Sequence, residues 1–235
     1  MRKAFLILFA ISKSLTGFGQ TNEDYINKGY EKLKLKDYNG AIEYLNKEIK
    51  INPNNSYAYW YRGYAFNALK KYQKAIKNYN KAIELNNINA DFFVNRAFSR
   101  EQIKDHNGAV LDYNRAIELR PKYADAYFDR GNEKFILKDY QGAISDYNNA
   151  IEFDSVNVNS FFERGDVKYV LKDYKGALSD FYFVIKISPN LSLAYYNIGL
   201  TEIKLNQKEN ACSDFKKALD LGDKRAKKLI NKYCK

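Results

Sequence analysis

Apolar and small residues recur with helical spacing between residues 124 and 154. They stand three and four residues apart in two runs, which a polar stretch at residues 138–142 separates. The runs are Tyr127, Gly131, Phe135 and Leu137, and then Ala143, Tyr147, Ala150 and Ile151. This pattern predicts two helices that fold into a hairpin. Neither helix carries enough apolar surface to be stable alone in water, so the hairpin needs neighbours with the same pattern.

The same pattern returns along the chain at a constant offset of 34 residues. Four slots hold residues of one kind in every copy. These slots are Leu35, Leu69, Ile103, Leu137, Leu171 and Leu205; Gly29, Gly63, Ala97, Gly131, Gly165 and Gly199; Ala41, Ala75, Ala109, Ala143, Ala177 and Ala211; and Leu45, Tyr79, Tyr113, Tyr147, Phe181 and Phe215. All three prolines, Pro53, Pro121 and Pro189, fall in the turn that follows the second helix.

A repeat of this length, with a glycine, paired alanines and a closing proline, resembles the tetratricopeptide repeat. Ala97 and Glu48 depart from the pattern, in place of a glycine and of the second alanine. The resemblance implies an all-α, right-handed α-solenoid of tandem helix-turn-helix hairpins. It predicts six repeats, at residues 22–55, 56–89, 90–123, 124–157, 158–191 and 192–225. Residues 226–235 would form a C-terminal capping helix.

Residues 1–19 differ from the rest of the chain. Arg2 and Lys3 precede a short apolar run at residues 4–11, and Gly17 and Gly19 offer small side chains for cleavage. This pattern predicts a signal peptide and an exported product, periplasmic or secreted. The run is shorter than the ~20 residues of a membrane-spanning helix. The alternative is a frayed hydrophobic N-terminus, which Lys13 within the segment would suit.

The charge is concentrated at the C-terminus. The chain carries 39 Lys and Arg against 28 Asp and Glu, so its net charge is +11, and cleavage after residue 19 would leave +8. Residues 223–235 hold six cations and one acid, which gives 6 − 1 = +5. Such a basic cap could contact a membrane or a glycan, or form a solvated end of the array. Nucleic-acid binding is not expected, because the cations do not follow one groove.

The two cysteines stand almost symmetrically about the turn at Gly222 and Asp223. Cys212 and Cys234 would lie at the same end of an antiparallel hairpin folded there. In an oxidising compartment this predicts a disulfide between them. The alternative is a pair of free buried thiols.

We find no pattern typical of an enzyme, a cofactor site or a metal site. His106 occupies a slot in which most repeats have tyrosine, so we interpret it as a packing residue. Arginines recur at the same 34-residue offset, and so do aspartates on the neighbouring helix. These residues, Arg62, Arg96, Arg130 and Arg164 with Asp112, Asp146 and Asp180, predict a ladder of ion pairs between helices.

The remaining hypothesis is a surface that binds a partner. In the family that this chain resembles, the fifth, ninth and twelfth slots of each repeat line a concave groove. The groove residues predicted here are Tyr30, Trp60, Tyr64, Val94, Phe98, Phe128, Asn132, Phe162, Asp166 and Tyr196. Acidic residues flank its middle: Asp91, Asp125, Asp129, Glu163 and Asp166.

The aromatic residues favour a protein or peptide partner with apolar side chains, and the acids favour one with some positive charge. The alternatives are rings that only pack between helices, a structural role through self-association, and an envelope role of the basic cap.

Overall fold

The computed structural model describes residues 24–234, which form thirteen helices and contain no strand. The helices are α1 (Tyr25–Lys34), α2 (Tyr38–Ile51), α3 (Ser56–Ala68), α4 (Tyr72–Leu85), α5 (Ala90–Gln102), α6 (His106–Leu119), α7 (Ala124–Ile136), α8 (Tyr140–Phe153), α9 (Val158–Val170), α10 (Tyr174–Ile187), α11 (Ser192–Lys204), α12 (Lys208–Asp220) and α13 (Ala226–Tyr233). The predicted all-α solenoid is confirmed. The predicted signal peptide lies outside the described residues.

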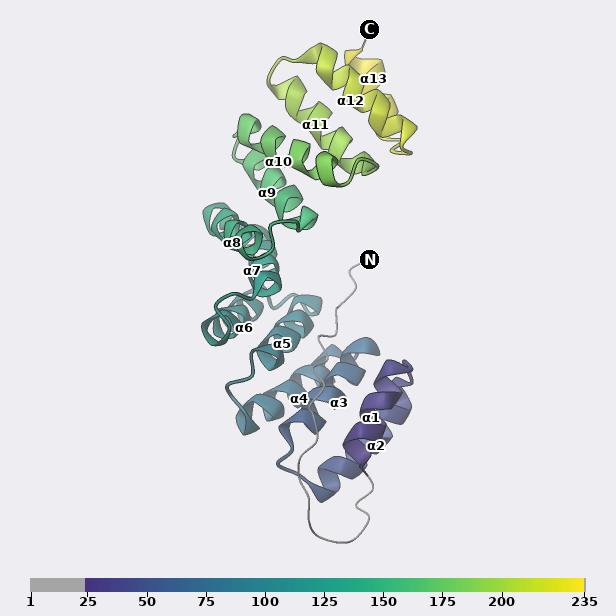
Figure 1. The fold of residues 1–235 in the computed structure, drawn as a ribbon, viewed down its shortest axis with the longest axis vertical. Helices are drawn as coiled ribbons and strands as arrows, with labels where there is room; N and C mark the ends of the chain where they lie inside the picture. The colour runs from purple at the N-terminus through teal and green to yellow at the C-terminus, as the bar shows by residue number, and fades with distance from the viewer. Residues whose placement is uncertain (1–23, 235) are drawn as a thin grey trace.

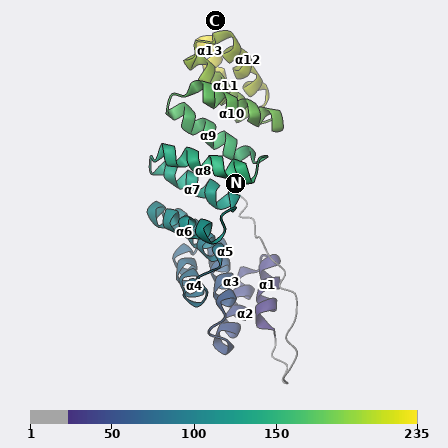
Figure 2. The ribbon, with the colours of Figure 1, turned by 60° about the vertical axis from the view of Figure 1, so that its left-hand side comes forward.

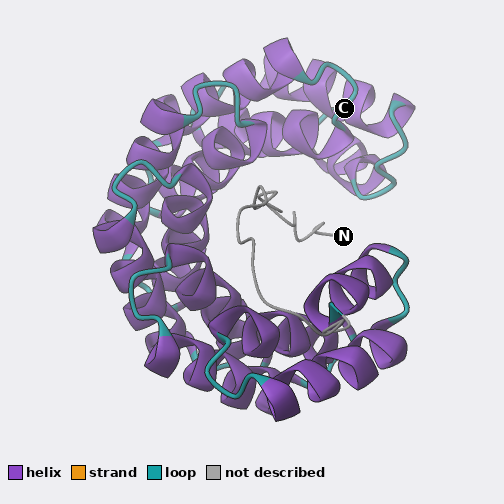
Figure 3. Cartoon of the chain, turned by 60° about the horizontal axis from the view of Figure 1, so that its bottom comes forward, coloured by secondary structure: helices purple, strands orange, loops and turns teal. Residues whose placement is uncertain are grey.

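Consecutive helices pack as antiparallel pairs, from α1 with α2 to α11 with α12, and each pair stacks on the next (Figures 1 and 2). The stack curves into an arc with two layers of helices (Figure 3). Pro53, Pro121 and Pro189 lie in the turns between pairs, as the sequence predicts. No helix among residues 24–234 is long and apolar enough to cross a membrane.

Each pair closes where a glycine of its first helix meets a large side chain of its second helix. At Gly131, an added Cβ atom would lie 2.8 Å from Cε1 of Tyr147, and at Gly63 it would lie 2.6 Å from Cε1 of Tyr79. Both tyrosines are completely buried. The absence of a side chain at these glycines therefore allows the two helices to approach closely.

The turn within each pair ends the first helix with a residue in the left-handed region. Lys138 has φ 64°, and its N–H donates to the carbonyl of Phe135. The next residue, Asp139, donates to the carbonyl of Lys134, which completes a Schellman-type end. Asp139 also caps α8 by accepting the N–H of Gly142 at 3.0 Å. The predicted break at residues 138–142 is thus shorter in the structure, because α8 begins at Tyr140.

The predicted ladder of ion pairs is confirmed for Arg96, Arg130 and Arg164, whereas Arg62 donates to the neutral side chains of Asn78 and Asn46. The Arg130 guanidinium donates to both oxygens of buried Asp146, at 2.8 and 2.6 Å. Its third nitrogen donates to Asn114 of the preceding pair at 2.7 Å. Arg96 and Arg164 make the corresponding contacts with Asp112 and Asp180. Each of these arginines therefore connects three helices.

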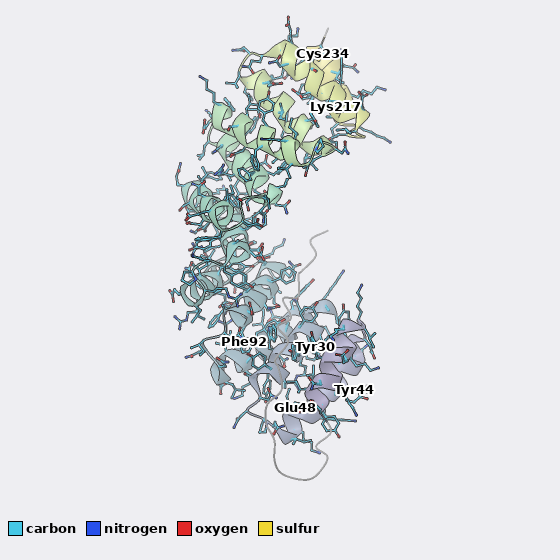
Figure 4. The ribbon with its side chains drawn as sticks, viewed as in Figure 1. Tyr30, Tyr44, Glu48, Phe92, Lys217 and Cys234 are labelled. Atoms are coloured by element: carbon cyan, nitrogen blue, oxygen red, sulfur yellow. A yellow bond between two sulfur atoms is a disulfide. The ribbon has the colours of Figure 1, made fainter. Side chains whose placement is uncertain are left out.

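The C-terminal end is closed by α13 and a disulfide. Ala226 of α13 packs against Phe215 and Ala218 of α12. Cys212 and Cys234 are bonded, with their Cα atoms 5.6 Å apart, as the sequence predicts. Figure 4 places Cys234 at the end of the molecule opposite Tyr44 and Glu48. The disulfide closes a loop with a sequence separation of 22 residues, which in the chain-entropy model contributes about 3 kcal/mol.

Candidate functional site

The first helices of the pairs form the inner layer of the arc. We call α1, α3, α5, α7, α9 and α11 the inner helices. They contact one another as well as their partners, α1 with α3, α3 with α5 and α7 with α9. Helices on the shorter radius of a curved stack approach each other more closely. Figure 1 agrees, since α5 and α7 lie toward the open side of the arc relative to α6 and α8.

Two of the ten predicted groove residues are buried, and none of them is fully exposed. Trp60 is only 7% exposed and packs against Phe92, with ring centroids 5.5 Å apart. Asn132 is also buried, and its Oδ1 accepts the hydroxyl of Tyr147 at 2.9 Å. The other eight are half-buried: Tyr30, Tyr64, Val94, Phe98, Phe128, Phe162, Asp166 and Tyr196. The sequence interpretation of Trp60 as an open ring is therefore corrected.

The rings of the fifth slot pack back onto the outer helices. Phe128 lies 5.9 Å from Tyr147, Phe162 5.6 Å from Phe181, and Tyr196 lies 6.2 Å from Phe215, measured between ring centroids. These second rings are the ones that cover the glycines. The fifth-slot rings thus contribute to closing each pair, and only part of each ring reaches the inner surface.

A different set of slots is the most exposed on the inner helices. The second, sixth, ninth and thirteenth residues of each repeat lie on one face of the inner helix. The steps between them are four, three and four residues, which is the spacing of side chains on one helical face. On α7 this face carries Asp125, Asp129, Asn132 and Ile136, and on α9 it carries Asn159, Glu163, Asp166 and Val170. We call these two sets the acidic stripes.

Each acidic stripe ends in an exposed aliphatic residue that the sequence analysis missed. Ile136 is 52% exposed and Val170 is 45% exposed. The same slot holds Lys34, Gln102 and Lys204 in three other repeats and the small Ala68 in the fourth. That departure from a polar slot is the signal from which they could have been found. Both aliphatic side chains lie one helical turn beyond a polar residue of the same stripe.

Asp166 is the most perturbed group of the stripes. Its Oδ1 accepts the side-chain amide of Asn197 on α11 at 2.8 Å. Burial, together with the nearby Glu163 carboxylate, raises the pKa of the Asp166 carboxyl to about 7, although the hydrogen bond from the Asn197 amide opposes this shift. Near neutral pH this carboxyl is therefore partly protonated, and a cation beside it would favour its ionised form.

Asp91 is not part of this acidic surface. Both of its oxygens accept from the Arg120 guanidinium, at 3.0 and 3.1 Å, and the hydroxyl of Tyr123 donates to it at 2.9 Å. The sequence predicts that Asp91 flanks the groove, but in the structure an intramolecular arginine already neutralises it. The other four predicted acids, Asp125, Asp129, Glu163 and Asp166, lie on α7 and α9.

His106 contributes a polar contact in addition to its packing. Its Nδ1 lies 2.7 Å from Oε2 of Glu133, which is buried on the following inner helix. Among residues 24–234, no group of three or more His, Cys, Asp or Glu side chains is arranged to hold a metal ion. His106 therefore packs at the helix junction and also contacts the carboxyl of Glu133.

Models of one repeat family match most of this array. The model described as TPR repeat matches residues 63–104 and 102–132, and the one described as Tetratricopeptide repeat matches 25–55, 124–157 and 193–221. The chain is a tetratricopeptide repeat protein. No curated protein matches it.

Several solved structures share the fold. MamA is 25% identical, with a TM-score of 0.67 over 70% of this chain and 96% of its own. YrrB, whose structure is described as a TPR protein with an unusual peptide-binding site, is 21% identical, with a TM-score of 0.71 over 80% and 97%. A tetratricopeptide repeat protein from Parabacteroides merdae is 21% identical, with a TM-score of 0.70 over 92% and 100%.

Proposed function

We propose that this tetratricopeptide repeat protein is a non-catalytic interaction scaffold of six repeats. Its inner face binds a peptide or helical segment of a partner protein. The acidic stripes contact cationic and aliphatic side chains of that segment. The single observation that carries this proposal is the juxtaposition, on α7 and α9, of acids with the exposed Ile136 and Val170.

Charge and burial together favour a cationic segment over a purely apolar one. A half-buried carboxylate in a partly dehydrated site interacts more strongly with a cation than a fully solvated one does. Asp166 has this environment, and a partner lysine or arginine beside it would lower its pKa from about 7. The half-buried rings of Tyr64 and Phe98, on α3 and α5, extend the same inner layer with apolar surface. The peptide-binding site named for YrrB supports this kind of ligand.

The test uses two fluorescently labelled helical peptides of equal length, one built from lysine and leucine and the other from glutamate and leucine. Anisotropy titrations should show tighter binding of the lysine peptide. Its affinity should rise between pH 6 and pH 8, because Asp166 ionises across that range. Glu163→Gln with Asp166→Asn should weaken it about tenfold, which corresponds to about 1.4 kcal/mol.

The matched control is Glu152→Gln, which removes an exposed acid from the outer helix α8. This variant should bind the lysine peptide as the wild type does. Equal affinity for the two peptides would contradict a cationic ligand. An unchanged affinity of the double variant, Glu163→Gln with Asp166→Asn, for the lysine peptide would contradict it too. Circular dichroism on each variant confirms that the array is folded.

The basic cap favours a second candidate role at the cell envelope. The cations Lys224, Arg225, Lys227, Lys228 and Lys232 are all exposed on or beside α13. Such a face can contact anionic lipid or glycan, and the Cys212–Cys234 disulfide suits the oxidising compartment that export would supply. Sedimentation with vesicles containing anionic lipid, at low and high salt, tests this role with and without residues 224–235.

A further inference from the structure

The Arg–Asp ladder stops at the last pair of helices. Where α9 carries Arg164 and Lys168, α11 carries Ile198 and Glu202 at the same places in the repeat. The acid of the second helix is nevertheless kept, as Asp214 on α12. The last pair has therefore lost two cations and gained a second carboxyl opposite the first.

A third change accompanies these two. The asparagine that accepts from each arginine in the preceding pairs is replaced on α10 by Tyr182. Its hydroxyl donates to Oε1 of Glu202 at 2.9 Å. Tyr182 on α10, Glu202 on α11 and Asp214 on α12 thus form a contact set that takes the place of the ladder at this interface.

The surroundings of Glu202 favour a proton between its carboxyl and that of Asp214. Glu202 is completely buried, and its Oε2 is enclosed without a donor from the rest of residues 24–234. The carboxyl of Asp214 lies within hydrogen-bonding reach of it. Two ionised carboxylates are acceptors only, so they would repel each other where Glu202 is buried. A proton on Oε2 gives that oxygen a hydrogen bond to Asp214.

We propose that Glu202 and Asp214 share one proton that holds α11 against α12 in the last pair of helices, and that losing it at raised pH loosens this pairing. The array would then carry a pH-sensitive joint at its C-terminal end. The middle pairs, whose aspartates face cations, would keep their pairing.

The direction follows from the groups that face Glu202. These are Tyr182 from α10 and Asp214 from α12, and neither supplies a positive charge. Burial raises the pKa of Glu202 from 4.5 to about 7, and burial also raises the pKa of Asp214. The folded state therefore binds more protons than the unfolded state between pH 4.5 and 7. Stability of the last pair falls with rising pH across this window, and the contribution of the proton is lost above it.

The test measures amide hydrogen exchange in α11 and α12 of the full chain at pH 5.5 and pH 8, corrected for the intrinsic exchange rates. The opening equilibrium of these helices should rise on the order of tenfold at pH 8, relative to α7 and α8 in the same molecule. Glu202→Gln should abolish this rise, because its amide can accept from Tyr182 and donate to Asp214 without titrating. Glu209→Gln, an exposed change on α12, is the matched control and should keep it.

A second variant should reverse the direction in which the opening of α11 and α12 depends on pH. Glu202→Lys restores the cation found at Lys168, so Asp214 would form an ion pair that is lost on acidification. Opening of α11 and α12 in this variant should therefore increase toward low pH.

Carboxyl-carbon NMR of the wild type gives a reading that does not depend on any variant folding. A titration of Glu202 near pH 7 supports the proposal, and one below pH 5 overturns it. Identical pH profiles for the wild type and Glu202→Gln would overturn it too. If 1 mM calcium chloride protected the wild type from exchange at pH 8 but did not protect Glu202→Gln, the two carboxyls would hold a cation. That result would overturn the shared proton.

Discussion

The pairs α3–α4 and α7–α8 are built on the same packing but are connected by different polar contacts. In both, a tyrosine ring covers a glycine of the first helix: Tyr79 covers Gly63, and Tyr147 covers Gly131. In α7–α8, Arg130 meets a buried carboxylate, which the Lys134 ammonium also contacts at 2.9 Å.

In α3–α4, Arg62 meets the neutral amide of Asn78 at 2.8 Å instead. The residue that corresponds to Lys134 is Phe66. The first turn of α4 also lacks a side-chain cap, since Lys71 stands where α8 has Asp139. The close contact of ring and glycine therefore defines the pair, while the polar contacts vary around it.

The largest effect should come from the part that the two pairs share. Tyr79→Ala and Tyr147→Ala each remove a completely buried ring, and each should lower the free energy of unfolding by about 3–5 kcal/mol. Urea denaturation followed by circular dichroism measures both. The change of Leu111, which is 66% exposed on α6, to alanine is the exposed control and should cost far less.

Removing only the hydroxyls should separate the two pairs. The hydroxyl of Tyr147 donates to Asn132, so Tyr147→Phe should cost about 1 kcal/mol. The hydroxyl of Tyr79 is buried without a hydrogen-bond partner among residues 24–234, so Tyr79→Phe should be neutral or stabilising. An equal cost for the two changes would mean that the rings sit in more similar surroundings than these contacts indicate.

The next effect concerns the ladder, in which the two pairs differ. Asp146→Ala leaves two partly buried cations, Arg130 and Lys134, without their carboxylate, and should cost about 2–4 kcal/mol. Asn78→Ala removes a neutral acceptor from Arg62 and should cost about 1 kcal/mol. A double-mutant cycle of Asp146→Ala with Arg130→Leu measures the coupling. Coupling no larger than that of Asn78 with Arg62 would show that the charge adds nothing to the contact.

The repeat register explains why the fold and the ladder could be predicted from the sequence. A 34-residue offset fixes which residues of neighbouring helices face each other, so the Arg130–Asp146 contact follows from spacing alone. The same holds for Cys212 and Cys234, because a hairpin turn lies midway between them.

The inner surface could not be predicted in the same way. One step along a helix turns a side chain by about 100°, so a slot next to the exposed face can lie in the interior. Trp60 is buried because its ring fills the space beside Phe92, which depends on how closely α3 and α5 approach. Asp91 is neutralised by Arg120, a turn residue outside the ladder register. The sequence shows at Ile198 that the ladder ends at the last pair of helices. The contact that replaces the ladder could be recognised only from the structure, which places the hydroxyl of Tyr182 beside Glu202.

The smallest effect should come from the helix cap that only one of the two pairs has. Asp139 accepts the N–H of Gly142 in the first turn of α8, and Asp139→Ala should cost about 1 kcal/mol. Lys71 makes no such contact at α4, so Lys71→Ala should leave stability unchanged within error. Hydrogen exchange locates the effect, since only the first turn of α8 should lose protection. If Lys71→Ala lost as much stability as Asp139→Ala, the side-chain cap would not be what distinguishes the two helix starts.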